Sequence, residues 1–237
     1  MQTAVRTHAG LVRQQNEDSY VMLPEYNFFA VADGMGGHQA GAFASNLALN
    51  VVKEQVMTSN TVEDLRSQLT NAVREANRRV YELSRKEPGK EGMGTTLTAL
   101  WLRDGIGHLA HIGDSRAYLL RDFQLDLLTV DHSLVGELVR HGSLTLSEAE
   151  SHPQRHVLTR ALGIEAEVKV DTRSMTLKSG DLLLLCTDGL TSLVGDQEIK
   201  SAFLHTKGLE ASLEQLVELS LKRGGNDNIT VLAILLD

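Results

Sequence analysis

Several apolar runs in this chain end or begin beside an aspartate that is flanked by glycine or another turn-forming residue. The four aspartates placed in this way are Asp33, Asp114, Asp188 and Asp227. Runs such as 28–32, 182–186 and 229–236 have the length and composition of strands that are covered on both faces. Four carboxylates at the rim of one core repel each other unless cations lie between them. Because oxygen ligands suit Mg²⁺ or Mn²⁺, the pattern predicts a metal-dependent enzyme.

The expected strands and helices follow one another in an order that fits a layered sandwich. Strands are expected at 3–8, 19–23, 27–32, 96–102, 107–112, 117–120, 124–129, 167–171, 181–186 and 229–236, and helices at 42–56, 65–83, 196–204 and 209–223. Two mainly antiparallel β-sheets, packed together and each covered by a helix pair, satisfy this order. The sequence therefore predicts an α+β fold, a four-layer αββα sandwich. Because no linker-like stretch interrupts it, residues 1–237 are expected to form a single domain.

Residues 131–163 follow neither the strand nor the helix pattern for long. They combine short helical pieces with Pro153 and are expected to leave the sheet as an insertion. His132 begins this segment and is expected to order it. His152 and His156 are four residues apart, but no zinc-motif glutamate accompanies them, so both are expected on the surface of the insertion.

Composition excludes several classes of protein. The single cysteine, Cys186, lies in an apolar run, which leaves neither a disulfide framework nor a zinc–thiolate site and indicates a reducing, cytoplasmic compartment. The net charge of −8 argues against nucleic acid as the main partner. No apolar stretch approaches the roughly 20 residues that span a bilayer, so no membrane segment is expected. A monomer is expected because no surplus of apolar surface is evident.

The glycine-rich turn that starts at Asp33 has more than one interpretation. An Asp-Gly pair after a strand is most often a simple turn. Gly34, Gly36 and Gly37 also resemble a phosphate cradle, but their spacing matches neither the dinucleotide-binding nor the P-loop pattern. Because the turn leads directly into a helix, we expect these glycines to let the backbone approach a metal, with the Gly34 carbonyl as a ligand.

Arg13, Glu17 and Asp18 lie just before the second expected strand. In isolation this segment fits a solvated polar turn. In the functional interpretation, the Arg13 guanidinium clamps phosphate oxygens through two hydrogen bonds. Glu17 and Asp18 then accept hydrogen bonds from metal-bound water.

Six short motifs occur in one order along the chain. They are Arg13…Asn16-Glu17-Asp18, Asp33-Gly34-Met35-Gly36-Gly37, Gly94-Thr95-Thr96, Gly113-Asp114-Ser115-Arg116, Thr187-Asp188-Gly189-Leu190 and Asp227-Asn228-Ile229-Thr230. Each motif alone is weak, but the ordered set is specific. From about residue 7 to residue 235 the chain resembles the metal-dependent Ser/Thr protein phosphatases of the protein phosphatase 2C family, in their compact bacterial form.

The resemblance implies two metal ions at one edge of the sandwich. It implies that Asp33 bridges both ions and that the Gly34 carbonyl completes one of the two sites. By the same resemblance, Asp188 and Asp227 hold the other ion. Asp114 is then associated with a third, weaker ion that it shares with Asp188. The expected ions are Mn²⁺ or Mg²⁺.

The resemblance also assigns roles around the ions. Arg13 takes the substrate phosphate, Asn228 joins Glu17 and Asp18 as a residue near the ions that does not bind them, and residues 131–163 form a mobile flap beside the site. Many eukaryotic relatives have a histidine general acid where this chain has Met35, whose side chain transfers no proton. His38 is the candidate substitute, and a metal-bound water is the alternative proton donor.

The expected reaction is hydrolysis of phosphoserine and phosphothreonine in proteins, by direct attack of a metal-bridging hydroxide and without a phosphoenzyme. The expected partners are phosphorylated proteins, and the resemblance adds a Ser/Thr protein kinase of the same cell. One alternative is a phosphatase dedicated to a single regulatory phosphoprotein, such as an anti-sigma antagonist. A non-catalytic phosphoprotein-binding module would have lost metal ligands, whereas this chain retains all four aspartates. An unrelated Mg²⁺-dependent nucleotide hydrolase has little support, because only 4% of the residues are aromatic.

Overall fold

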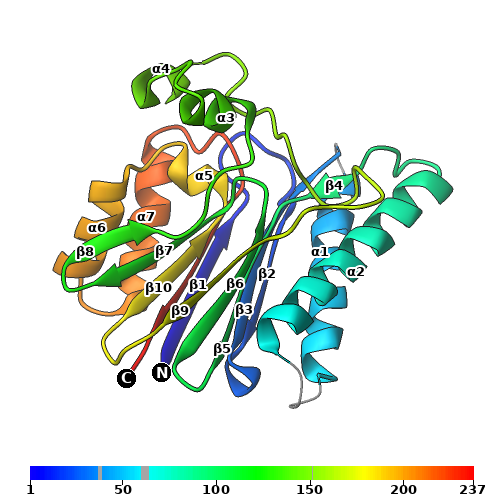
Figure 1. Ribbon diagram of the computed structural model, residues 1–237. Coiled ribbons are helices and arrows are strands. Elements are labelled where there is room, and N and C mark those ends of the chain that lie inside the picture. Colours follow the sequence, from blue (N-terminus) through cyan, green and yellow to red (C-terminus); the bar gives the residue numbers. More distant parts are fainter. Residues whose placement is uncertain (37–38, 60–63, 151) are drawn as a thin grey trace.

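The apolar runs pair into two antiparallel sheets that lie face to face (Figure 1). The computed structural model describes residues 1–237 except 37–38, 60–63 and 151. In the described residues the first sheet has the order β1-β11-β10-β7-β8, and the second has the order β2-β3-β5-β6-β9 with β4 paired to β3. The strands of the first sheet are β1 (Gln2–His8), β7 (Arg116–Arg121), β8 (Gln124–Leu127), β10 (Leu182–Cys186) and β11 (Ile229–Leu235). Those of the second are β2 (Asp18–Leu23), β3 (Phe28–Met35), β4 (Gly94–Thr95), β5 (Leu97–Arg103), β6 (Ile106–Ile112) and β9 (Asp171–Thr176).

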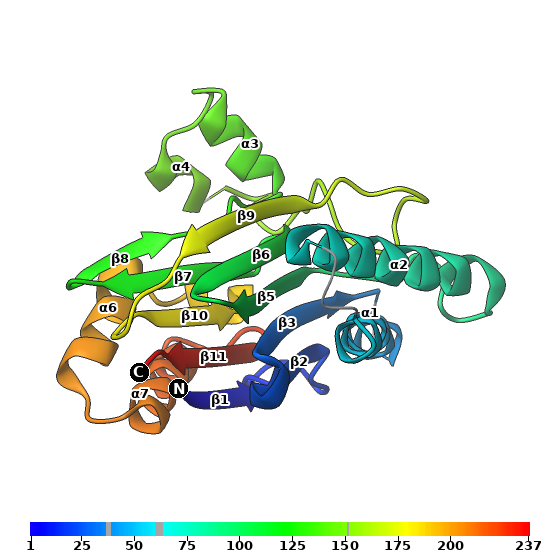
Figure 2. The ribbon, with the colours of Figure 1, turned by 60° about the horizontal axis from the view of Figure 1, so that its bottom comes forward.

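Figure 2 shows the two stacked sheets with helices on their outer faces. Three apolar layers hold these sheets and helices together. In β3, Phe29 and Val31 point into the layer between the sheets, whereas Phe28 and Ala30 point outward, as the two-residue period of a strand requires. The outward side chains pack under helices α1 (Gln39–Met57) and α2 (Leu65–Lys86). Helices α6 (Asp196–His205) and α7 (Leu209–Lys222) cover the outer face of the first sheet. The expected αββα sandwich is confirmed.

The pairing of β1 with β11 fixes which end of the sandwich carries the chain termini. The register runs from Gln2↔Leu235 to His8↔Ile229, so both termini lie at one end and the loop that precedes β11 lies at the other (Figure 1). Within the described ranges, no helix is both long enough and apolar enough to cross a bilayer.

One expected strand is wrong. The strand expected at 167–171 is irregular chain, and the sheet edge is formed by β9, which begins only at Asp171. Val168 and Val170 alternate like strand residues, but they pack against the apolar layer under α1 and α2. The Asn77 side chain of α2 holds this returning chain by donating to two of its carbonyls at 3.0 and 3.1 Å. The residues of β9 are mostly polar, so the edge strand shows no apolar alternation.

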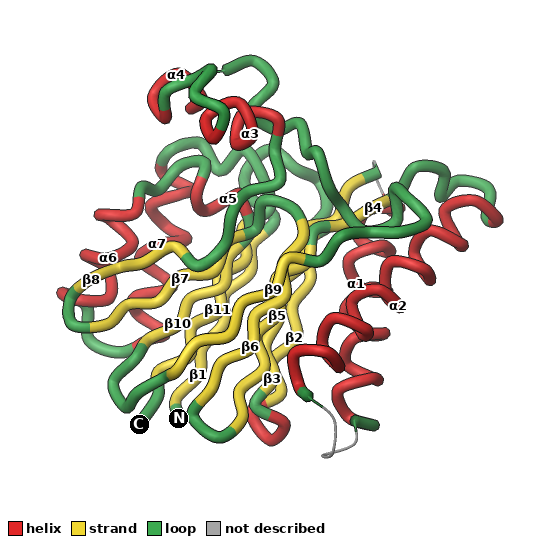
Figure 3. The backbone as a smooth tube through the Cα atoms, in the orientation of Figure 1, coloured by secondary structure: helices red, strands yellow, loops and turns green. Residues whose placement is uncertain are grey.

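Residues 131–163, named here the flap, leave the first sheet after β8 and lie above the end of the sandwich that is opposite to the termini (Figure 3). They include the short helices α3 (Leu134–Arg140) and α4 (Leu146–Glu150). Single bridges join Ser133 to Leu158 and Thr95 to Leu162. Two further short elements were not expected from the sequence: a 3₁₀ turn at Pro24–Tyr26 and helix α5 (Asp188–Thr191).

Candidate active site

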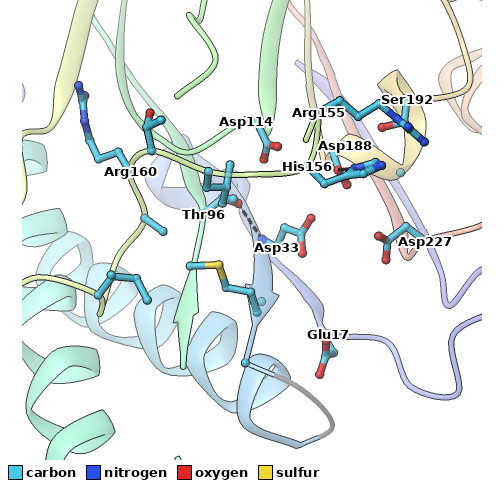
Figure 4. Close-up of a pocket in the computed structure, with 18 of the residues that line it drawn as sticks. Glu17, Asp33, Thr96, Asp114, Arg155, His156, Arg160, Asp188, Ser192 and Asp227 are labelled. Atoms are coloured by element: carbon cyan, nitrogen blue, oxygen red, sulfur yellow. Dashed lines mark hydrogen bonds and ion pairs between the residues drawn. The ribbon is translucent and has the colours of Figure 1, made fainter. Parts of the chain in front are cut away.

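The strand ends bring the predicted site residues to the end of the sandwich beneath the flap. Asp33 is in β3, Asp114 follows β6, Asp188 begins α5 after β10, and Asp227 precedes β11. In Figure 4 the four carboxylates surround a common space. The pocket there has a volume of about 880 Å³. Seven of the residues expected from the sequence line it: Arg13, Glu17, Asp33, Gly34, Asp114, Asp188 and Asp227.

Thr96 joins the backbone of Asp33 to the loop that carries Asp114. The Thr96 amide donates to the Asp33 carbonyl at 2.9 Å, and the Asp33 amide donates to Thr96 Oγ1 at 2.9 Å. The same hydroxyl lies 2.7 Å from Ser115 Oγ. Gly113 has a φ of +105°, and a Cβ there would lie 2.5 Å from the Thr96 side chain, so glycine is required for this close approach. The contacts set the spacing between Asp33 and Asp114.

Thr187 places Asp188 at the first position of α5. It is fully buried and precedes the helix as its N-cap residue. Its hydroxyl donates to Asp18 Oδ2 at 2.8 Å and accepts from the Thr230 amide at 2.9 Å. The hydroxyl therefore links Asp18 at the start of β2 to the ends of β10 and β11.

Asn228 fastens the loop of residues 9–17 to the start of β11. Its Oδ1 accepts from the Glu17 amide at 2.8 Å, and its Nδ2 donates to the carbonyls of Ala9 and Gln15, both at 2.9 Å. Asn228 and Asp18 are not among the described residues that line the pocket. The sequence places both near the ions, and the structure shows them behind the pocket wall, where they hold backbone and hydroxyl groups.

Arg13 points toward the pocket from the loop that Asn228 fastens. Its Nη2 donates to Asp227 Oδ2 at 2.7 Å, and about half of its side chain is exposed. This hydrogen bond raises the pKa of the Arg13 guanidinium, which therefore stays charged. A fixed and partly exposed guanidinium at the pocket mouth can bind an anion.

Two of the pocket aspartates, Asp33 and Asp114, ionise less readily than free carboxylates. Burial raises the pKa of Asp33 and Asp114 well above its ordinary value, and neighbouring carboxylates raise it further. Burial also raises the pKa of Asp18 to about 7, although hydrogen bonds from Thr230 and Thr187 oppose the shift. Bound cations reverse this effect, because positive charge favours the ionised carboxylates.

The donor atoms of the pocket fit hard divalent ions. Asp188 Oδ1, in the pocket, is buried and accepts no hydrogen bond from any described residue, which is costly unless a cation satisfies it. The other facing donors are also carboxylate oxygens, which suit Mg²⁺ or Mn²⁺. In the described part of the chain, no three acidic, histidine or cysteine side chains are gathered closely enough to hold an ion as they stand. The aspartates thus share a pocket with their like charges kept apart.

The flap contributes three residues to the pocket that were not expected there from the sequence. Arg155, His156 and Arg160 line the pocket, and His156 Nδ1 lies 3.9 Å from Asp188 Oδ2 (Figure 4). The His156 side chain is 54% exposed, so it lies on the flap surface as expected, but on the side that faces the pocket. Irregular chain has no periodicity, so nothing in the sequence distinguishes this side.

Two residues bear on the identity of the general acid: Met35, at the position where many eukaryotic relatives have a histidine, and His38, the candidate substitute. Met35 lines the pocket, and a Cβ added to Gly94 would lie 2.7 Å from Met35 Cε and 2.9 Å from Ile164 Cδ1. Met35 therefore packs with Ile164 over Gly94 and forms an apolar part of the wall. His38 lies outside the described residues.

Comparisons with known proteins show which family this chain belongs to. A family model described as Protein phosphatase 2C matches residues 6–231. The serine/threonine phosphatase stp of Listeria monocytogenes serotype 4b is 37% identical over 99% of this chain and 95% of its own length. The crystal structure of the Mycobacterium tuberculosis serine/threonine phosphatase PstP/Ppp is 42% identical, with a TM-score of 0.92, over 100% of this chain and 99% of that one.

A further solved structure is the catalytic domain of the serine/threonine protein phosphatase PstP in complex with two manganese ions. It is 39% identical, with a TM-score of 0.90, over 100% of this chain and 98% of that one. The fold of two antiparallel sheets flanked by helices is therefore the fold of these phosphatases. The family match covers far more than half of the residues. The chain belongs to the protein phosphatase 2C family.

Proposed function

We propose that this protein is a metal-dependent phosphatase that hydrolyses phosphoserine and phosphothreonine in proteins. The observation that carries the proposal is the meeting of four aspartates, from the strand ends of two sheets, in one pocket with Arg13 at its mouth. The family and the relatives named as serine/threonine phosphatases support it. Retention of all four aspartates disfavours a binding-only module.

We assign the metal ligands by combining the pocket with the family resemblance. Asp33, the Gly34 carbonyl, Asp188 and Asp227 would hold two ions, and Asp114 with Asp188 would hold a third, weaker one. The manganese complex of the relative PstP supports Mn²⁺, and the hard oxygen donors also suit Mg²⁺. When bound, such ions supply Lewis acidity and a water that ionises near neutral pH.

The side chains of this protein then bind and orient the phosphorylated residue. The Arg13 guanidinium neutralises charge on the phosphate oxygens, and the Asp227 carboxylate fixes its orientation. Thr187 and Asn228 keep the Asp18 carboxylate and the Glu17 backbone in place behind the ligands. Met35 cannot provide the leaving-group proton, and its side chain gives that part of the pocket wall an apolar surface.

The proposed function is tested by phosphate release from matched phosphothreonine, phosphoserine and phosphotyrosine peptides with Mn²⁺, Mg²⁺ or a chelator. We expect release from the phosphoserine and phosphothreonine peptides with Mn²⁺, much less from phosphotyrosine, and none with the chelator. Release that persists unchanged in the chelator would overturn metal dependence. Activity restricted to one intact phosphoprotein would favour the dedicated regulatory phosphatase.

Replacing Arg13 with alanine should raise KM for the phosphothreonine peptide and change kcat little. A hydrogen bond to a charged group contributes about 1.5–3 kcal/mol, so KM should rise roughly ten- to hundredfold. The measurement is steady-state kinetics at saturating Mn²⁺. The matched control is Arg6→Ala, because Arg6 pairs with Glu214 on the surface at 3.0 Å. An unchanged KM in Arg13→Ala would remove Arg13 from the substrate site.

We extend the proposal to the domain organisation and oligomeric state of the enzyme, the source of its substrates and its cellular compartment. Residues 1–237 would act as a single catalytic domain, as a monomer, with the flap as a mobile part of it. A protein kinase that phosphorylates serine or threonine would supply its substrates. The single buried thiol, Cys186, fits a reducing compartment, so we place the protein in the cytoplasm.

A further inference from the structure

His132 forms two hydrogen bonds with the backbone of Gly113, the residue that precedes Asp114. The Gly113 amide donates to His132 Nδ1 at 3.0 Å. In return, the His132 amide donates to the Gly113 carbonyl at 2.8 Å. Both backbone polar groups of Gly113 are thus satisfied by one residue at the start of the flap.

One tautomer of the neutral ring satisfies both Gly113 and Asp171. Because Nδ1 accepts from the Gly113 amide, the proton of the neutral ring is on Nε2. That nitrogen donates to Asp171 Oδ2 at 3.0 Å. The Arg160 guanidinium lies 2.9 Å from the same nitrogen and donates to Asp171 Oδ1 at 2.8 Å. Burial lowers the pKa of His132, and the nearby Arg160 charge opposes its protonation, which agrees with a neutral ring.

The surroundings leave the ring little freedom to move. His132 is 3% exposed, and its ring packs on that of His111 with centroids 4.8 Å apart. The backbone of Gly113 is equally confined, because Thr96 lies against its Cα. A displacement of the His132 ring is therefore transmitted to the loop that carries Asp114.

We propose that His132 is a positioning residue for the metal site: its Nδ1 fixes the Gly113 backbone and thereby aims the Asp114 carboxylate into the pocket. The inference rests on the proposed function, because it needs Asp114 to bind an ion. It also connects the site to the flap, since Nε2 of the same ring donates to Asp171, Arg160 of the flap donates to the same carboxylate, and Arg160 lines the pocket.

Two substitutions test the contacts of the two ring nitrogens of His132 separately. In His132→Asn the amide oxygen can occupy the place of Nδ1 and accept from the Gly113 amide. In His132→Gln the amide nitrogen can occupy the place of Nε2 and donate to Asp171, while the contact with Gly113 is lost. Both variants lose the ring and its packing on His111. A role in packing alone would therefore affect them alike.

The experiment measures Mn²⁺ binding by titration calorimetry, together with the Mn²⁺ dependence of phosphate release from the phosphothreonine peptide. Loss of a hydrogen bond that orients a metal ligand typically lowers affinity about 10–100-fold. We expect His132→Gln to weaken the weakest of the bound ions by about tenfold or more, and His132→Asn to stay within about threefold of the unsubstituted protein. The matched control is His108→Gln, a histidine of β6 bonded to Ser174 at 3.1 Å and outside the pocket, which should change nothing.

Three other outcomes of the titrations overturn the inference. Equal losses in the two variants assign His132 to packing, and a loss confined to His132→Asn assigns it to the contact with Asp171. Unchanged binding in both variants removes it from the site. Should neither variant fold, ¹⁵N NMR of the unsubstituted protein decides: the inference needs an unprotonated Nδ1, and a proton there contradicts it. Failure of the proposed function is distinct, because the unsubstituted protein itself would then release no phosphate with any ion.

Discussion

Replacing Asp33 with asparagine is expected to abolish turnover, with a loss of roughly a thousandfold or more, because the residue assigned to both main ions loses its charge. Mn²⁺ affinity should fall together with activity. Phosphate release and titration calorimetry measure the two effects. The matched control is Asp126→Asn, an exposed aspartate of β8. A fully active Asp33→Asn variant would remove Asp33 from its assigned role.

The same substitution should have the opposite effect on the stability of the protein in chelator. The raised pKa of Asp33 means that the folded state disfavours its ionised form, so ionisation above the unfolded pKa of about 3.9 opposes folding. At pH 7.5 asparagine removes this cost, and Tm in chelator should rise by about a few degrees. Saturating Mn²⁺ should stabilise the original protein and leave Asp33→Asn nearly unchanged. A lower Tm in chelator would contradict the repulsion among the carboxylates.

Replacing Gly189 with alanine is expected to cause the largest loss of stability. A Cβ there would lie 1.9 Å from the Asn228 carbonyl oxygen and 2.8 Å from its carbon. Backbone cannot yield as a flexible side chain can, so α5 must move away from the start of β11. We expect the free energy of unfolding to fall by about 3 kcal/mol. Mn²⁺ affinity should fall as well, because α5 begins at Asp188.

Urea denaturation measures this loss against a glycine that has free space. At Gly195, the N-cap residue of α6, an added Cβ would meet only the Glu198 carboxylate at 3.9 Å. Gly195→Ala should therefore cost no more than the roughly 1 kcal/mol of a weakened cap and leave Mn²⁺ affinity intact. If the two variants are equally stable, the close packing of α5 on Asn228 does not constrain the site.

The strongest elements of the sandwich could be predicted from the sequence because burial on both faces leaves unbroken apolar runs. Strands β3, β10 and β11 and the core-facing stripe of α2 are of this kind. The aspartates at the ends of such strands could be predicted to share one edge, since the topology of two stacked sheets leaves few other arrangements. The pattern could not say how closely their side chains approach, because that distance depends on the charges between them.

The rest depends on contacts between residues that are distant in sequence. Val168 and Val170 alternate like a strand but fill a gap beneath two helices, and periodicity cannot distinguish these two kinds of burial. In the sequence, a polar residue such as Asn228 looks the same whether it faces an ion or binds a loop. In the structure, Asn228 holds the loop of residues 9–17 through three hydrogen bonds. Which side of the flap faces the pocket depends on where the irregular chain of the flap returns to the sheet. His156 lies on the pocket side for this reason.

The neighbouring chain termini have a practical consequence. β1 and β11 pair along their whole length, and the Met1 amino group forms an ion pair with the Asp237 side chain. A short glycine–serine linker could therefore connect the two ends in a circular permutant. New ends opened at the exposed turn of Asp122 and Phe123, between β7 and β8, would leave the four pocket aspartates in their present positions along the chain. Such a permutant places an attached fluorophore or immobilisation tag on a turn that does not line the pocket.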